Sequence, residues 1–127
     1  DWVNHLRKVV GKPDEDCILV GHSLGCIASL RYVESLQPGQ KVGAVFLVAG
    51  FTDDINIPEL HNFYETPINW GFIKSHCKKF VAINSDNDPY VPLEHGHTFE
   101  KELGAKLIIG HFLYILTPVK VRPSMAV

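Results

Sequence analysis

Four short apolar segments, separated by stretches with helical periodicity, constrain the fold of this chain more than any other feature of its sequence. The segments are residues 17–21, 42–50, 79–85 and 105–109. The first two are continuous apolar runs, which are typical of strands buried on both faces of a parallel sheet. Strands that alternate with helices imply βαβ units. We therefore expect an α/β fold with a mainly parallel sheet of about four strands flanked by helices.

The stretches between these segments carry the helix signals. Helices are expected at residues 1–10, 24–36, 67–77 and 93–103, and residues 51–66 form an irregular, acidic and aromatic segment. In the first helix, Trp2, Leu6 and Val9 share one face. Pro67 is expected to start the third helix, and Gly104 is expected to close the fourth.

Length and composition indicate one soluble domain spanning residues 1–127. The formal charge of −2, with scattered basic residues, gives no reason to expect nucleic acid or a membrane surface as a partner. The three cysteines are an odd number and match no zinc spacing, which indicates buried thiols in a reducing compartment. Residues 1–10 do not resemble a signal sequence, and no apolar stretch is long enough to span a bilayer, so we expect a cytoplasmic location.

One serine lies between two glycines where the first apolar run meets the second helix. The sequence GHSLG at residues 21–25 matches the G-x-S-x-G pattern of the nucleophile elbow. In that turn the Ser23 hydroxyl stands above the end of the strand, and the Leu24 N–H can point at a developing oxyanion. The alternative is an ordinary turn in which the serine caps the helix. A buried strand before the pattern and a helix after it favour the elbow.

A nucleophilic serine needs a histidine base held by a carboxylate, and the chain offers both in the expected order. Asp86 and Asp88 follow the third strand, and His111 follows the fourth. The residues alone leave both aspartates open, and each of the three is also an ordinary turn or loop residue. His22 cannot reach round to Ser23 and is expected to line the pocket instead. The remaining histidines lie too early in the topology or away from a strand end.

Three segments of the sequence resemble the small serine hydrolases of the retinoblastoma-binding-protein-9 and YdeN type. They are ILVGHSLGCIASLRYVESL, FYETPINWGFIKSHCKKFVAINSDNDPYVPLEH, and LGAKLII followed by GHF, and the resemblance covers residues 2–112. It implies a compact α/β-hydrolase with Ser23 as the nucleophile and His111 as the base. It also implies that Asp88 is the acid and Asp86 a turn residue. No cofactor and no metal are implied.

The resemblance implies an enzyme that cleaves small carboxylic esters through an acyl-enzyme. Phe51, Phe63 and Trp70 are then expected to line the acyl pocket together with His22, although three aromatic core residues would have the same pattern. Two other functions stay open. One is a non-catalytic binding module, or an inactive truncated copy, that retains the hydrolase fold and binds a protein partner. The other is an acyltransferase that uses the same triad.

The sequence departs from the family pattern at three places. The family begins with a strand and a glycine-containing loop that supplies the second oxyanion N–H, and we expect both to be absent from residues 1–127, which start after them. The loop before the histidine is shortened to Gly110, and residues 113–127 do not resemble the usual closing helix because Pro118 and Pro123 would break it. We therefore expect the strand at residues 17–21 to present an unpaired edge through which the chain self-associates.

Overall fold

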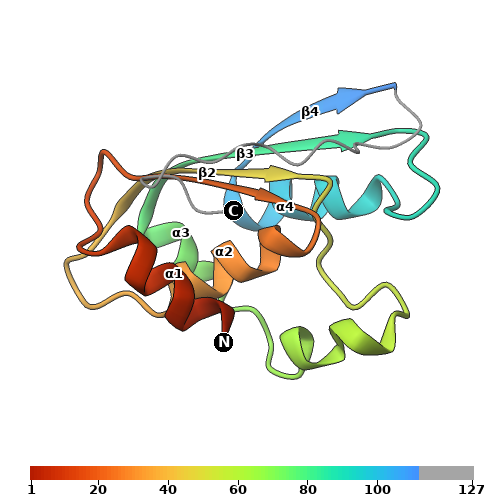
Figure 1. Cartoon of the computed structure of the whole chain (residues 1–127). Coiled ribbons are helices and arrows are strands. Elements are labelled where there is room, and N and C mark those ends of the chain that lie inside the picture. Colours follow the sequence, from red (N-terminus) through yellow and green to blue (C-terminus); the bar gives the residue numbers. More distant parts are fainter. Residues whose placement is uncertain (112–127) are drawn as a thin grey trace.

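The computed structural model describes residues 1–111, which form a parallel four-stranded sheet with its helices on one face (Figure 1). The strands are β1 (Ile18–His22), β2 (Val42–Val48), β3 (Cys77–Ser85) and β4 (Lys106–Gly110). They lie in the order β1-β2-β3-β4, and each neighbouring pair is parallel. The expected α/β class and parallel sheet are confirmed. The expectations for Phe112 and for residues 113–127 lie outside the described residues.

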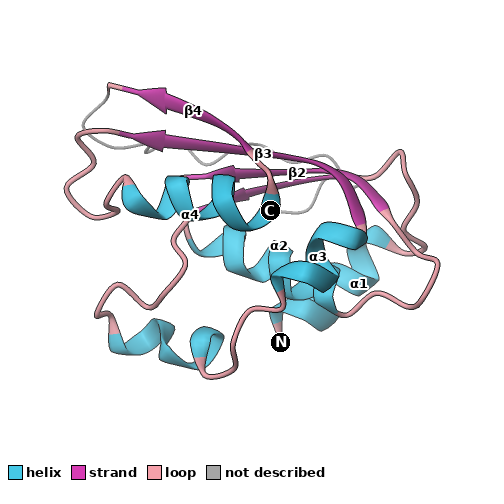
Figure 2. Ribbon diagram, turned by 180° about the vertical axis from the view of Figure 1, so that it is seen from behind, coloured by secondary structure: helices cyan, strands magenta, loops and turns pink. Residues whose placement is uncertain are grey.

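The order of the strands explains why the helices share a face. The helical elements are α1 (Trp2–Val10), α2 (Leu24–Glu34), the 3₁₀ helix η1 (Pro58–Tyr64), α3 (Trp70–Ser75) and α4 (Glu94–Leu103). Each connection from one strand to the next advances in the same direction along the sheet. Because such crossovers are right-handed, the helices that lie between two strands are all carried to the same side. Figure 2 shows this arrangement, with α2, α3 and α4 beneath the strands.

Helix α1 contacts the core along part of its apolar face. The Asp1 carboxylate caps it by accepting the Val3 N–H at 2.9 Å. Leu6 is 3% exposed and Val10 packs against the core, whereas Trp2 and Val9 are 44% and 40% exposed. The predicted helix is thus confirmed, and two of its apolar residues remain accessible.

The ends of the later helices are set by local side-chain and backbone chemistry. Helix α3 begins at Trp70, not at Pro67, because the Asn69 side chain accepts the Phe72 N–H at 3.1 Å and so caps the helix there. Helix α4 ends at Leu103, and the next residue, Gly104, caps it with a left-handed φ of 65°, as predicted.

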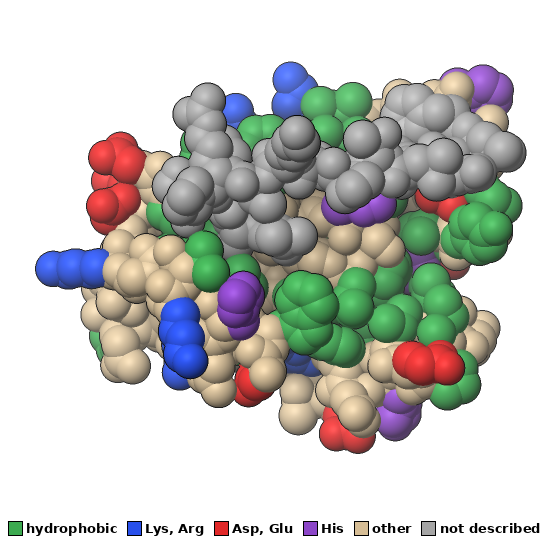
Figure 3. Space-filling model, viewed as in Figure 1, with side chains coloured by type: hydrophobic (Ala, Val, Ile, Leu, Met, Phe, Trp, Pro, Cys, Tyr) green, Lys and Arg blue, Asp and Glu red, His purple; other side chains and the backbone are tan. Residues whose placement is uncertain are grey.

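The core lies between the sheet and the helices, and α2 is at its centre. Fully buried side chains come from α2, the sheet, α3 and α4, and include Tyr32, Leu19, Leu47, Ile73 and Phe99. All three cysteines are free and buried, as expected. Along the surface shown in Figure 3, Lys and Arg side chains are scattered. No helix of residues 1–111 is long and apolar enough to cross a bilayer.

Strand β1 lies at one edge of the sheet within residues 1–111. It pairs with β2 from Ile18 to His22 and with no other described strand. Leu19 is fully buried on the side of the helices, whereas Ile18 and Val20 are half-buried. Its outer backbone groups thus have no partner in a described strand.

Candidate active site

Ser23 occupies a strained turn between β1 and α2. Its φ of 55° and ψ of −117° lie in a region that residues other than glycine rarely adopt. Such a backbone costs roughly 1–3 kcal/mol and persists only where the surroundings enforce it. Here the Ser23 N–H donates to Val48 O at 2.8 Å, and the Ser23 carbonyl accepts the Cys26 N–H at 3.0 Å. The side chain makes no capping hydrogen bond, which argues against the capping alternative.

The first glycine of the pattern is required by the close approach of strand and helix. A Cβ atom at Gly21 would lie 2.6 Å from Gly25 O and 2.8 Å from Cys26 Cα. Contacts this short do not occur for real Cβ atoms. Glycine at position 21 therefore lets α2 begin directly above the strand, which places Ser23 at the carboxyl edge of the sheet.

The first residue of α2 supplies a donor beside the serine. Leu24 is at the N-terminus of the helix, so its backbone N–H has no intrahelical acceptor. The helix dipole gives this end a partial positive charge. An oxyanion that develops next to Ser23 would therefore be stabilised by a hydrogen bond from the Leu24 N–H and by the helix dipole.

The thiol beneath the turn cannot replace the Ser23 hydroxyl as a nucleophile, and the described residues form no metal site. Cys26 is fully buried beneath the turn, and its Sγ lies 3.3 Å from Gly21 O and 3.4 Å from Val48 O as a donor. Burial raises the pKa of this thiol far above its ordinary value, so it stays protonated and is not a nucleophile. Residues 1–111 contain no group of three or more His, Cys, Asp or Glu side chains placed to hold a metal.

The candidate acids and base lie at the same edge of the sheet, after β3 and β4. Asp88 Oδ1 accepts the N–H groups of Tyr90 at 2.8 Å and Val91 at 3.0 Å, which fixes it within its own turn. Asp86 Oδ1 lies 2.7 Å from His111 Nδ1. Among the described hydrogen bonds, His111 is thus joined to Asp86 and not to Asp88, the acid that the family resemblance implies.

The register of the sheet explains the contact between Asp86 and His111. Ser85 is the partner of Gly110 in the β3–β4 ladder, and the Asp86 N–H donates to Gly110 O at 2.9 Å. Asp86 and His111 directly follow this pair of residues and are therefore also neighbours. Gly110 belongs to β4 itself, so no loop separates His111 from the strand.

The nucleophile and the base are not in contact. No hydrogen bond within residues 1–111 joins Ser23 to His111. The His111 side chain is 79% exposed, and that of Asp86 is 42% exposed. The structure thus brings the three expected elements to one edge of the sheet, but it assembles only a histidine–carboxylate pair.

The aromatic residues expected in an acyl pocket differ in their surroundings. Phe51 is 2% exposed, and Trp70 packs edge-on against Phe99 with ring centroids 6.2 Å apart. Phe63 is half-buried against the core. His22, the last residue of β1, is half-buried next to Ser23. Phe51 is thus a core residue, while Phe63, Trp70 and His22 are each half-buried.

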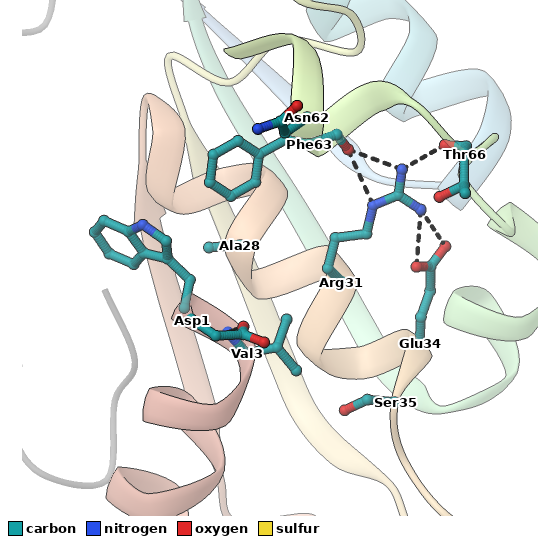
Figure 4. Close-up of a pocket in the computed structure, with 10 residues that line it drawn as sticks. Asp1, Val3, Ala28, Arg31, Glu34, Ser35, Asn62, Phe63 and Thr66 are labelled. Carbon is teal, nitrogen blue, oxygen red and sulfur yellow. Dashed lines mark hydrogen bonds and ion pairs between the residues drawn. The ribbon is translucent and has the colours of Figure 1, made fainter. Parts of the chain in front are cut away.

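A groove of about 750 Å³ lies along α2, away from the serine (Figure 4). Its lining comes from the start of α1, from α2 and from the segment around η1, and none of its residues is a candidate for the triad. Arg31 crosses it and donates to Phe63 O at 2.9 Å and to Thr66 O, and it pairs with Glu34 at 2.9 Å. The guanidinium thereby ties the segment 58–66 to α2.

One buried histidine was not identified from the sequence. His95 is 4% exposed at the start of α4, and its Nδ1 lies 3.0 Å from Thr52 N and 2.9 Å from Thr52 Oγ1. Its place in the helix after the acid turn excluded it as the base. That place, seven residues after Asp88, gave no sign that the ring would be buried against Thr52.

Comparisons with known proteins agree with the resemblance seen in the sequence. A family profile described as "Serine hydrolase" matches residues 1–112. Serine hydrolase RBBP9 of Rattus norvegicus is 33% identical over 105 residues, which cover 78% of this chain and 54% of the relative. The putative hydrolase YdeN of Bacillus subtilis (strain 168) is 31% identical over 118 residues, with coverages of 89% and 62%. The chain thus spans less than two thirds of the length of either relative.

Solved structures give the same result for the fold. The crystal structure of the ydeN gene product from B. subtilis has a TM-score of 0.78 and 30% identity, and the match covers 88% of this chain and 61% of that chain. Esterase PE8 has a TM-score of 0.56 at 20% identity, with coverages of 86% and 46%. The second likeness concerns the fold alone.

Proposed function

Since this chain belongs to the serine hydrolase family, we propose that it hydrolyses small carboxylic esters through an acyl-enzyme on Ser23. The observation that carries the proposal is the strained backbone of Ser23, with φ 55° and a side chain that makes no capping hydrogen bond. Strain of this kind is found where a reactive group must be held in an exposed position. The Leu24 N–H beside it is suited to hold an oxyanion.

The reaction would proceed in two steps, acylation of Ser23 and hydrolysis of the acyl-enzyme. His111 takes the proton of Ser23 Oγ while Oγ bonds to the ester carbonyl carbon, and the Leu24 N–H donates to the resulting oxyanion. The intermediate collapses with loss of the alcohol, which receives that proton from the imidazole. Water then attacks the acyl-enzyme in the same way, with His111 as base, and releases the acid and free Ser23.

We assign the acid role to Asp88. Its Oδ1 is fixed by two backbone N–H donors, which leaves Oδ2 for an imidazole. The competing contact between Asp86 and His111 joins two exposed side chains, and exposed ion pairs of this kind are worth only about 0–1 kcal/mol. Such a weak contact can give way when His111 turns towards Ser23.

For the acyl group, we propose contact with His22, which is half-buried directly beside Ser23. Phe51, which is 2% exposed, would support the pocket from behind. Phe63 lines the groove along α2, and Trp70 packs against Phe99, so we assign neither to the pocket.

A fluorophosphonate probe tests the proposal, because it phosphonylates only an activated serine. We expect it to label the wild-type chain and not Ser23→Ala. Ser75→Ala is a matched control, since Ser75 is an exposed serine on α3 whose hydroxyl bonds to its own helix. Labelling that persists in Ser23→Ala would refute the assignment.

A non-catalytic binding module is the second candidate, and one observation favours it. His111 contacts Asp86 and not Ser23 in the structure. Turnover of p-nitrophenyl acetate above the Ser23→Ala background separates the two functions. A missing oxyanion donor lowers rates by about 10²–10³, so slow but serine-dependent turnover supports the enzyme. Added alcohol that captures the acyl group would indicate an acyltransferase.

A further inference from the structure

His95 is the only buried histidine among the seven of this chain, all of which lie within the described residues. It is 4% exposed and lies in the first turn of α4, shortly after the turn that carries Asp88. Burying an imidazole is costly unless its polar atoms are hydrogen-bonded. Its partner therefore indicates what the residue does.

That partner is the chain segment that follows β2. The Thr52 N–H donates to His95 Nδ1 at 3.0 Å, and Thr52 Oγ1 lies 2.9 Å from the same nitrogen. A backbone N–H can only donate, so Nδ1 must be the acceptor and the proton of the neutral ring is on Nε2. The imidazole thus fixes the backbone at residue 52, which is 43 positions away in sequence.

The segment 48–52 is also the surface against which the nucleophile turn packs. Val48 O accepts the Ser23 N–H at 2.8 Å. A Cβ atom at Gly50 would lie 2.8 Å from Cys26 Sγ, so the Cys26 side chain of α2 packs directly against the backbone of this segment. A shift of this segment would therefore move the Ser23 backbone.

The same segment is strained and is held from its other sides as well. Ala49 has a positive φ of 51°. Tyr64 Oη donates to Phe51 O at 2.9 Å, and Asn84 Nδ2 lies 3.5 Å from Gly50 O. His95 completes this set of contacts at the far end. A strained segment keeps its shape only while such contacts define it.

We propose that His95 is a positioning residue of the hydrolase site, which holds the segment 48–52 through the Thr52 N–H and thereby holds Ser23 and the Leu24 N–H in their reactive geometry. The inference rests on the proposed function of Ser23. His95 itself touches no reacting atom. Its effect should therefore appear in kcat and leave KM for a small ester nearly unchanged.

The test compares three substitutions of His95 in the whole chain, with p-nitrophenyl acetate as the substrate. Asparagine places its amide oxygen where Nδ1 lies, whereas glutamine places it one atom farther out and phenylalanine offers no acceptor. We expect His95→Asn to keep kcat within about threefold of wild type. We expect His95→Phe and His95→Gln to lose about 10-fold to 100-fold, since misplacing a reactive group by about 1 Å costs up to about 10²-fold.

One readout and one control separate positioning from a merely structural role. Rates are expressed per folded chain, measured by circular dichroism, so a loss of folded protein does not count as a loss of kcat. His97→Phe is the control, because His97 is 56% exposed on the same helix and should leave both the rate and the folded fraction unchanged. If His95→Phe does not fold, the comparison of asparagine with glutamine decides.

Each outcome bears on the proposal. Equal kcat per folded chain in wild type, His95→Gln and His95→Phe would overturn the positioning role while the proposed function stands. Failure of His95→Asn to rescue would also overturn it. A wild-type chain without Ser23-dependent turnover would refute the proposed function, and the inference about His95 with it.

Discussion

Replacing Gly21 by alanine should destabilise the chain, because the added Cβ would overlap the backbone of α2. The added Cβ would lie 2.6 Å from Gly25 O, 2.7 Å from Gly25 C and 2.8 Å from Cys26 Cα. All three are backbone atoms of α2, so no side-chain rotation can relieve the overlap. Overpacking a close contact costs about 1–3 kcal/mol. Because the helix itself must move, we expect about 3 kcal/mol, a large part of a typical domain stability of about 5–15 kcal/mol.

Gly71→Ala is the matched control for this change. Gly71 lies in α3, and its nearest atom to an added Cβ is Asn69 Oδ1 at 4.0 Å. Alanine is the better helix former, so we expect a neutral effect or a gain of up to about 1 kcal/mol. The substitution is the same at both positions, but at Gly71 no atom lies close enough to the added Cβ to overlap with it.

The assay is urea unfolding followed by circular dichroism. Gly21→Ala should lower the midpoint at an unchanged m-value, and it should also slow labelling of Ser23 because the turn is displaced. A Gly21→Ala chain within about 0.5 kcal/mol of wild type would refute the reasoning. It would mean that α2 adjusts freely and that the turn does not constrain the serine.

Three further predictions follow from the acid turn, the thiols and the sheet edge. Asp88→Asn should lower kcat by up to about 10⁴-fold and Asp86→Asn far less, measured with p-nitrophenyl acetate; the reverse order would give the acid role to the residue that contacts His111. Burial raises the pKa of the Cys77 thiol from 9.0 to about 11, so the folded chain binds this proton more tightly than the unfolded chain does. The urea midpoint of unfolding should therefore fall as the pH rises from 9 through about 11. A midpoint that is constant over this range in wild type would contradict this. We propose that the edge of β1, which pairs with no second strand of residues 1–111, mediates self-association of this 127-residue chain. Val20→Lys should abolish this self-association in sedimentation analysis, and equal masses of both chains would count against it.

The sheet could be predicted from the sequence because its strands are marked by composition. Residues 42–48 are a continuous apolar run bounded by turn residues, and such runs have few alternatives in an α/β pattern. The C-terminus of α4 could also be predicted, because the residue after a helix often adopts a left-handed conformation, and glycine, here Gly104, does so without strain. The start of α3 was misplaced because the Asn69 cap took precedence over Pro67, and both residues are good starting signals.

The candidate site was predictable in its parts and not in its contacts. The position of Ser23 follows from a local pattern, and the structure gives it the strained backbone that this pattern requires. The contact of His111 with Asp86 depends on the register between β3 and β4, which the sequence does not specify. The bond between His95 and Thr52 joins residues from two different connections of the sheet. Non-local contacts of this kind have no signal in a single sequence.

Mass spectrometry of the acid-quenched reaction with p-nitrophenyl acetate tests the central claim most directly. If Ser23 is the nucleophile, the intact chain should carry one acetyl group at early times, and the peptide that contains Ser23 should bear it. Ser23→Ala should remain unmodified under the same conditions. A folded wild-type chain without an acetyl group, or one acetylated equally in Ser23→Ala, would contradict the account.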